Sequence, residues 1–259
     1  MPEGPEIFLF KEYLKGYILN NYLTRIISIS KNKIIIPEKV KIIEIGSKGK
    51  LLWLRTDNYY IHILLKISGW VSKENLKNPK YILIFDEDKK VYIDDPRKLC
   101  QIKIVDLKEH ENVLTILGID IFSKEFTLGI FTNLLKSYAL NICSFLMDQY
   151  IICGVGNYIK NESLYLARIH PKRKSNSLSN NEANNLFISI RFVSYSNLFE
   201  QLDQNKIKTK KILSSTKPKN LEVPYIFKVY KEEYDPNGFK VKSEIISGRN
   251  TYYVPDLQI

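Results

Sequence analysis

The sequence predicts an α+β protein with a strand-rich N-terminal part and a helical C-terminal part. From about residue 21 to residue 107, short runs of β-branched and aromatic residues alternate with turn residues. Residues 128–202 instead carry apolar residues at helical spacing. A length of 259 residues suits two domains that each bury a core. We therefore expect a two-layered antiparallel β-sandwich followed by a helical domain.

A short helix opens the chain, because Ile7, Phe10, Leu14 and Tyr17 form one apolar stripe. Eight strand-like runs follow at intervals of about 8–12 residues, which is typical of a sandwich or a barrel. They are RIISIS, KIIIP, KIIEIGS, KLLWLRT, YIHILLKI, YILIF, KVYID and QIKIV.

Four segments after residue 127 have helical spacing, at residues 128–140, 142–150, 156–168 and 180–202. The last begins with Ser179-x-x-Glu182, a capping box. Gly154 and Gly156 form a turn between two of these helices. The tail returns to β character, and Asp235–Gly238 (DPNG) predicts a turn between strands at residues 227–234 and 239–246.

Positive charge is concentrated in one block of the chain. The net charge is +11, and residues 151–220 hold 12 Lys and Arg against 4 Asp and Glu. Such a block is typical of a surface that binds a polyanion such as nucleic acid, and a solvated lysine-rich face is the alternative.

The three cysteines, Cys100, Cys143 and Cys153, form no C-x-x-C pair. This argues against a disulfide framework and a four-cysteine zinc site, so we expect buried free thiols. The start of the sequence has no basic leader before an apolar run, and no apolar run approaches 18 residues, so we expect an intracellular protein without membrane association.

Pro2 is the first candidate for chemistry. Removal of Met1 would expose its secondary amine, and an α-amino group has a reference pKa of about 7.7–8.0, so part of it is neutral and nucleophilic near pH 7. Attack on a sugar C1′ would give an iminium that permits β-elimination. Glu3 and Glu6 are close enough in sequence to transfer protons, although early acids also stabilise a helix N-terminus.

Four motifs in order carry a family resemblance: MPEGPE at the start, Ser47–Leu52 (SKGKLL), MDQ at residues 147–149 with GVGNYIKNE at residues 154–162, and Gly248–Gln258 (GRNTYYVPDLQ). Together they resemble the formamidopyrimidine-DNA glycosylase and endonuclease VIII family. The Gly4 form of the opening is more similar to the endonuclease VIII branch. The resemblance extends from residue 2 to residue 258.

The resemblance implies roles for individual residues. Pro2, Glu3, Glu6, Lys50 and Arg249 would be catalytic. Lys50 and Arg249 would also contact DNA phosphates, together with Asn157 and Lys160 and the backbone N–H groups of the glycine turn. The hairpin positions that hold cysteines in zinc-binding members are Val254 and Leu257. This implies a zincless finger without metal, held by hydrophobic packing and turn chemistry.

A glycosylase that extrudes a base must fill the gap left behind. By resemblance, Ile67 would be the wedge, Arg97 would face the orphaned base, and Leu99 would lie beside it. Ile67 and Leu99 could equally be core residues.

The resemblance also implies a domain plan: residues 1–115 would form the catalytic β-sandwich, 116–127 a linker, 128–222 the helix–two-turns–helix DNA-binding domain and 223–259 the finger. The expected function is a bifunctional DNA glycosylase and AP lyase of base excision repair. It would excise oxidised bases, with pyrimidines and hydantoins favoured, through a Pro2 Schiff base and β,δ-elimination.

No cofactor is implied, and the partner would be damaged DNA, duplex or single-stranded, bound by a monomer. The site of action would be a nucleus or a cytoplasm, including that of a virus-infected cell. The alternative is a catalytically silent DNA- or RNA-binding protein.

Overall fold

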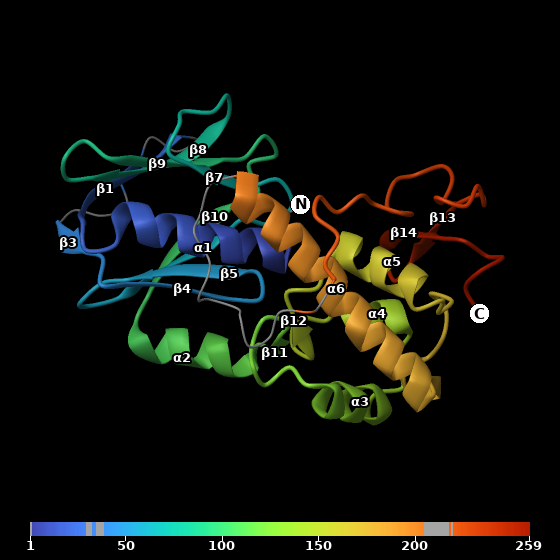
Figure 1. Cartoon of the computed structure of the whole chain (residues 1–259). Helices are drawn as coiled ribbons and strands as arrows, with labels where there is room; N and C mark the ends of the chain where they lie inside the picture. The colour runs from blue at the N-terminus through green and yellow to red at the C-terminus, as the bar shows by residue number, and fades with distance from the viewer. Residues whose placement is uncertain (1, 30–32, 35–38, 205–217, 219) are drawn as a thin grey trace. The chain divides into compact units, whose positions relative to one another are not determined.

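The computed structural model describes residues 2–29, 33–34, 39–204, 218 and 220–259. Its chain divides into two compact units (Figure 1). The N-terminal unit contains Pro2 and Glu6–Ile116, and the C-terminal unit contains Glu3–Pro5 and Leu117–Ile259. The short segment Glu3–Pro5 therefore belongs to the unit that is distant from it in sequence.

The N-terminal unit contains helix α1 (Gly4–Ile18) and two antiparallel sheets. One sheet has the order β2-β1-β8-β9-β7, with β3 paired to β1. Its strands are β1 (Tyr22–Ser28), β2 (Lys33–Ile34), β3 (Val40–Lys41), β7 (Trp70–Ser72), β8 (Pro79–Phe85) and β9 (Lys90–Asp94). The other has the order β10-β6-β5-β4, from β4 (Glu44–Lys48), β5 (Leu51–Arg55), β6 (Tyr60–Leu64) and β10 (Gln101–Val105).

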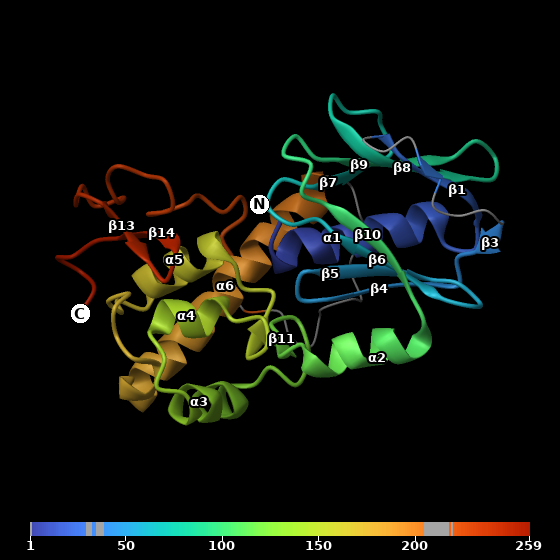
Figure 2. The same ribbon diagram turned by 180° about the vertical axis from the view of Figure 1, so that it is seen from behind.

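This arrangement confirms the predicted sandwich. Helix α1 lies between the two sheets in both views (Figures 1 and 2). Ile7, Phe10 and Leu14 on its apolar stripe are buried, as expected. Strand β7 was not among the predicted strands. The expected run at residues 33–37 is described only in part, because residues 35–37 lie outside the described residues.

Helix α2 (Leu107–Ile116) was not predicted. Its only buried residue is His110, so it has no apolar stripe to reveal its period. It packs on the four-stranded sheet through polar groups: His62 Nε2 lies 2.8 Å from His110 Nδ1, and Lys48 Nζ donates to the Leu114 carbonyl at 2.7 Å. The Tyr60 ring stacks on His110 with centroids 3.7 Å apart.

The C-terminal unit confirms the predicted helices. Each of the four expected segments contains one: α3 (Leu128–Ser137), α4 (Ile142–Met147), α5 (Asn157–Leu166) and α6 (Asn180–Gln204). The unit also has a 3₁₀ turn, η2 (Ser175–Ser177), and a short parallel pair, β11 (Ile119–Asp120) with β12 (Ile152–Cys153). Figure 1 shows α6 running beside α5.

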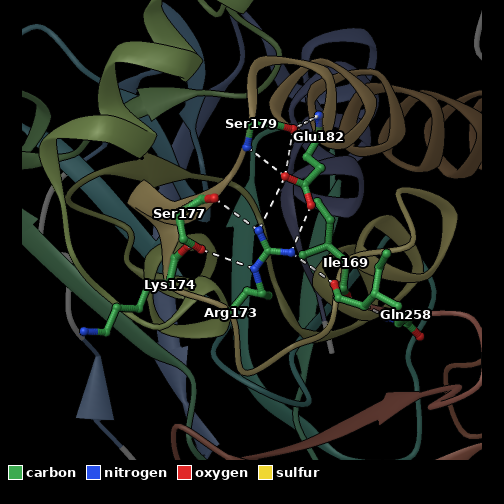
Figure 3. Close-up of polar contacts among 8 residues, drawn as sticks. Ile169, Arg173, Lys174, Ser177, Ser179, Glu182 and Gln258 are labelled. Atoms are coloured by element: carbon green, nitrogen blue, oxygen red, sulfur yellow. Dashed lines mark hydrogen bonds and ion pairs between the residues drawn. The ribbon is translucent and has the colours of Figure 1, made fainter.

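The capping box at the start of α6 is confirmed (Figure 3). Glu182 accepts the Ser179 N–H at 2.7 Å, and the Ser179 hydroxyl accepts the Glu182 N–H at 3.3 Å. Arg173 adds an ion pair to the same carboxylate, with Nη1 2.9 Å from Oε1. Burial raises the pKa of Glu182, but the Ser179 and Arg173 contacts outweigh it and leave the pKa lowered.

The C-terminal hairpin differs from the prediction. Its strands are β13 (Lys242–Ile246) and β14 (Arg249–Tyr253), joined by Ser247 and Gly248, both with positive φ. The expected strand at residues 227–234 is wrong, because no strand forms there. The predicted turn is present, since Asp235 accepts the N–H groups of Asn237 and Phe239 at 2.9 and 2.8 Å. This turn joins two residues in an isolated β-bridge, Tyr234 and Lys240, and not two strands.

Glu162 explains why residues 227–234 do not form a strand. This carboxylate on α5 has no exposed surface. It accepts four hydrogen bonds, from the Tyr225 hydroxyl and from the N–H groups of Lys228, Val229 and Tyr230, at 2.7–3.0 Å. Three successive N–H groups converge on one carboxylate, which is incompatible with the alternating N–H directions of a strand.

Hydrophobic packing completes the anchoring of the hairpin. Val229, Val241 and Val254 form a buried cluster, and Leu257 packs against it with Tyr165 and Tyr252. The apolar core of the hairpin therefore includes both Val254 and Leu257. These are the positions that hold cysteines in the zinc-binding members that the sequence resembles. Among the residues that the structure describes, no group of three or more His, Cys, Asp or Glu could hold a metal ion.

The three cysteines are buried and free, as predicted. Burial raises the pKa of Cys100 to about 12 and that of Cys143 to about 11. In the described parts of the chain, no helix has the length and apolar character needed to cross a membrane.

The His62–His110 pair predicts a loss of stability in acid. Burial, followed by the charges of His110 and Lys103, lowers the pKa of His62 to about 4, from about 6.5 in an unfolded chain. Between about pH 4 and pH 6.5 the unfolded chain therefore binds more protons than the folded chain. The free energy of unfolding thus falls by on the order of 2 kcal/mol as the pH drops from about 6.5 to about 4.

Urea unfolding followed by tryptophan fluorescence measures this loss, since Trp53 and Trp70 both lie in the N-terminal unit. Other charged side chains also shift the pKa values of the two histidines and are kept in the control protein: Glu44, Arg55, Lys103 and Glu111. The control, His62→Phe with His110→Phe, should show a smaller dependence on pH. An equal dependence in both proteins would contradict the assignment.

Glu162→Gln should loosen the segment before the hairpin. The new amide directs N–H donors at the donors that the carboxylate now satisfies, at a cost of about 1–3 kcal/mol for each buried group left unpaired. Hydrogen exchange at the amides of Val229 and Tyr230 should accelerate. The exposed Glu232→Gln is the matched control and should leave these amides unchanged.

Candidate functional site

Glu3 lies at the N-terminus of helix α5, 155 residues away in sequence. Its side chain has no exposed surface, and its carboxylate accepts the N–H groups of Tyr158 at 2.9 Å and Ile159 at 3.2 Å. The N-cap residue of α5 is Gly156, which supplies no capping side chain. Glu3 therefore caps the helix from outside, and its carboxylate lies at the positive end of the helix dipole.

The glycine turn makes room for this carboxylate. A Cβ on Gly156 would lie 2.2 Å from the carboxyl carbon of Glu3. Gly154 has φ +105 and accepts the N–H of Gly4 at 2.8 Å through its carbonyl. The Glu3 carboxylate occupies the N–H groups of Tyr158 and Ile159, and the expected phosphate contact of the backbone N–H groups in the glycine turn stays a prediction.

Asn157, the first residue of α5, is held by Asn250 and Lys160. Its Nδ2 donates to the Asn250 carbonyl at 2.9 Å, and its Oδ1 accepts from Lys160 Nζ at 2.9 Å. Lys160 Nζ also donates to Thr251 Oγ1 at 2.8 Å. These contacts fix the Asn157 amide against strand β14.

The structure places Lys160 beneath the surface, and its predicted role in DNA binding stays a prediction. The residue has no exposed surface, and its ammonium is directed inward to Asn157 and Thr251. Burial lowers its pKa, the positive charge of Arg249 acts in the same direction, and the charge of Glu3 opposes both.

Arg249 is exposed at the start of β14. Its neighbour Asn250 accepts a hydrogen bond from Asn157, the first residue of α5, so Arg249 lies near the N-terminal end of that helix. The C-terminal unit thus brings Glu3, Asn157, Lys160 and Arg249 together around one helix N-terminus. A buried carboxylate, a fixed amide and an exposed guanidinium in this arrangement suit an anionic ligand whose reaction involves proton transfer.

Aromatic residues beside Glu3 were missed by the sequence reasoning. The rings of Tyr158, Phe227, Tyr230 and Tyr252 form a chain of contacts with centroids 5.5–6.4 Å apart. Burial raises the pKa of Tyr230, and the negative charge of Glu3 raises it further. These residues follow no spacing that would reveal them, because residues 227–234 lie in an irregular segment.

Three candidate catalytic residues belong to the N-terminal unit. Pro2 is buried and lies two residues before the start of α1, and Glu6, in the first turn of that helix, is 7% exposed. Lys50 is half-buried in the two-residue turn between β4 and β5. Gly49, with φ +56, is the first residue of this turn, as tight hairpins require.

The candidate gap-filling residues lie in two loops of the same unit. Arg97 and Leu99 are exposed, with Leu99 at 42%, whereas Ile67 is half-buried. The alternative of a core position is therefore wrong for Leu99. Ile67 lies in the turn after β6, and Leu99 lies in the loop before β10.

The family models match two regions of the chain. The formamidopyrimidine-DNA glycosylase N-terminal domain matches residues 1–102, and the formamidopyrimidine-DNA glycosylase H2TH domain matches residues 117–212. Together these regions cover most of the chain.

Curated relatives carry the same family name. The formamidopyrimidine-DNA glycosylase of Wolbachia sp. subsp. Brugia malayi is 30% identical over 206 residues, which cover 74% of this chain and 76% of that protein. The corresponding protein of Rickettsia conorii is 30% identical over 209 residues, with 74% and 76% covered.

Solved structures agree with the fold. The MutM (Fpg) protein of Thermus thermophilus has a TM-score of 0.82 at 25% identity, covering 99% of this chain and 98% of that one. The Lactococcus lactis enzyme, solved with DNA containing an AP site, has a TM-score of 0.78 at 19% identity, with 99% of both chains covered. On these matches, and with its glycine turn, capped helix and C-terminal hairpin, the chain belongs to the formamidopyrimidine-DNA glycosylase family.

Proposed function

We propose that this protein is a bifunctional DNA glycosylase and AP lyase of base excision repair that acts on oxidised bases. The observation that carries the proposal is the Glu3 carboxylate, fully buried and fixed at the α5 N-terminus one residue after Pro2. A side chain that only stabilised the start of α1 would have no reason to lie there.

The reaction begins at the Pro2 amine once Met1 is removed. The nitrogen lone pair attacks C1′ of the damaged nucleotide, and the bond between C1′ and the base breaks, so that its electron pair leaves with the base. The Pro2 nitrogen then gives up its proton, the ring oxygen leaves C1′ and takes a proton from Glu3 to become the C4′ hydroxyl, and the nitrogen lone pair forms the iminium. Abstraction of a C2′ proton then expels the 3′ phosphate by β-elimination, and a further elimination expels the 5′ phosphate.

Glu3 is the group that moves protons in this scheme. The N–H groups of Tyr158 and Ile159 fix its two oxygens, so the carboxylate meets each intermediate in the same position. Glu6, buried in the first turn of α1, is proposed as a second proton-transferring group.

Phosphate binding would fall to Lys50, Asn157 and Arg249. The exposed Arg249 supplies a charged fork for a phosphate, and Lys160 fixes the Asn157 amide from below. Ile67, Arg97 and Leu99 would fill the gap left by the extruded base.

The proposed lesions are oxidised pyrimidines and hydantoins, on the Gly4 form of the opening motif. The relatives are named for formamidopyrimidine, so the branch within the family stays a prediction. We propose a monomer that acts inside the cell on damaged DNA, duplex or single-stranded. A silent DNA- or RNA-binding protein is less well supported, because it would not need the Pro2–Glu3 pair.

Borohydride trapping on DNA with an abasic site tests the nucleophile. The wild-type chain, shown by mass spectrometry to begin at Pro2, should form a covalent adduct because borohydride reduces the iminium to a stable amine. A variant that retains Met1 should form none, since its Pro2 nitrogen is acylated. Failure of the processed wild-type chain to trap would reject the enzyme proposal.

Gly156→Ala should displace Glu3 and slow base excision by on the order of 100-fold, because displacement of a reacting group by about 1 Å has effects of this size. Single-turnover excision measures the rate, and circular dichroism checks the fold. Gly129→Ala is the matched control, since a Cβ there meets nothing within 4 Å. A normal rate for Gly156→Ala would contradict the role of Glu3.

A further inference from the structure

One buried carboxylate joins the loop of Ile67 to the loop of Arg97 and Leu99. Asp95 is 1% exposed. Its Oδ1 accepts the Ser68 hydroxyl from the first loop and the Arg97 N–H at 3.2 Å from its own loop. Its Oδ2 accepts the Cys100 N–H at 2.5 Å. The residues after Ile67 and on both sides of Leu99 are therefore held by the same side chain.

Other contacts hold the two loops at a fixed separation. Cys100 Sγ donates to the Leu65 carbonyl at 3.1 Å, and that carbonyl also accepts the Gly69 N–H at 3.0 Å. A Cβ on Gly69 would lie 2.2 Å from Cys100 Sγ, so the loops are in direct contact. Lys80 Nζ, from β8, donates to the carbonyls of Lys98 and Cys100 at 2.5 Å each.

Both loops show the same backbone feature at their tips. Lys66, directly before Ile67, has φ +55, and Lys98, directly before Leu99, also has φ +55. Left-handed conformations of residues other than glycine persist where the surrounding structure imposes them. The backbone at each tip is thus constrained, which fixes the directions of the two apolar side chains that follow.

We propose that Asp95 is a positioning residue that fixes the Ile67 loop and the Arg97–Leu99 loop as one rigid wedge for the gap in duplex DNA. The inference rests on the proposed function, because a gap exists only where a base has been extruded from a duplex. It predicts that the effect of Asp95 on cleavage depends on the substrate. Loss of Asp95 should slow cleavage at an abasic site in duplex DNA much more than cleavage at an abasic site in single-stranded DNA.

The carboxylate suits this role in its ionised form. Burial raises the pKa of Asp95, but hydrogen bonds from Cys100, Ser68 and Arg97 outweigh burial and leave it below the ordinary value. An amide in its place could accept on one atom only and would direct N–H donors at the others.

The test compares two variants with a matched control. Asp95→Asn removes the charge, and Ser68→Ala removes only the bond between the loops, so it remains informative if Asp95→Asn fails to fold. The control is Asp86→Asn. Asp86 lies in the β8–β9 turn of the same unit, and it also accepts a backbone N–H, that of Tyr22, at 3.0 Å.

Two readouts separate a positioning role from loss of fold. The first is the ratio of strand cleavage at an abasic site in duplex DNA to cleavage in single-stranded DNA. We expect both loop variants to lower this ratio by about 10-fold or more, and the control to match wild type. The second is the fluorescence of 2-aminopurine opposite an uncleavable abasic analogue, which rises when a wedge unstacks the base and should rise less with the loop variants.

The outcomes are distinct from those of the proposed function. An equal loss on both substrates would show a merely structural role, and an unchanged ratio with unchanged fluorescence would overturn the inference. If the wild-type chain did not cleave at all, the proposed function would fail. The fluorescence change needs no turnover, so it would still decide whether Asp95 positions the wedge.

Discussion

The hydrogen bonds between the Glu3 carboxylate and the first turn of α5 are the constraint on which the C-terminal unit depends. They explain why Gly156 has no side chain, since any Cβ would occupy the place of the carboxyl group. They also explain why α5 has no cap of its own. The same helix then fixes Asn157 at its start and Glu162 in its middle, so one element sets the position of the Glu3 carboxylate, an amide and the segment before the hairpin.

Much of the fold follows from local patterns in the sequence. Alternating β-branched runs predict the sandwich, and helical spacing predicts α3 to α6, because in both cases one face of each element is buried. Helix α2 escapes this reasoning because its contacts are polar: a histidine pair and a lysine that bonds a carbonyl. The expected strand at residues 227–234 fails for a different reason, since Glu162 satisfies its N–H groups from a helix that is distant in sequence.

The candidate site was predictable only as a set of residue types. The GVGNYIKNE motif identified Asn157 and Lys160, but only the fold shows that the lysine is directed inward and that Glu3 occupies the helix N-terminus. Asp95 illustrates the same limit. In the sequence it is one acid in a short loop, whereas its hydrogen bonds to Ser68 and Cys100 make it the junction of two loops.

Pro2 and Glu3 are neighbours in sequence, yet they belong to different compact units. In modular proteins, an active domain can be copied into a new gene without the rest of the chain. Here one peptide bond separates the amine, counted with the sandwich, from the carboxylate, counted with the helices. A copy of residues 1–116 would carry Pro2 and Glu3 together, but without α5 its Glu3 carboxylate would lose the N–H groups of Tyr158 and Ile159 that fix it.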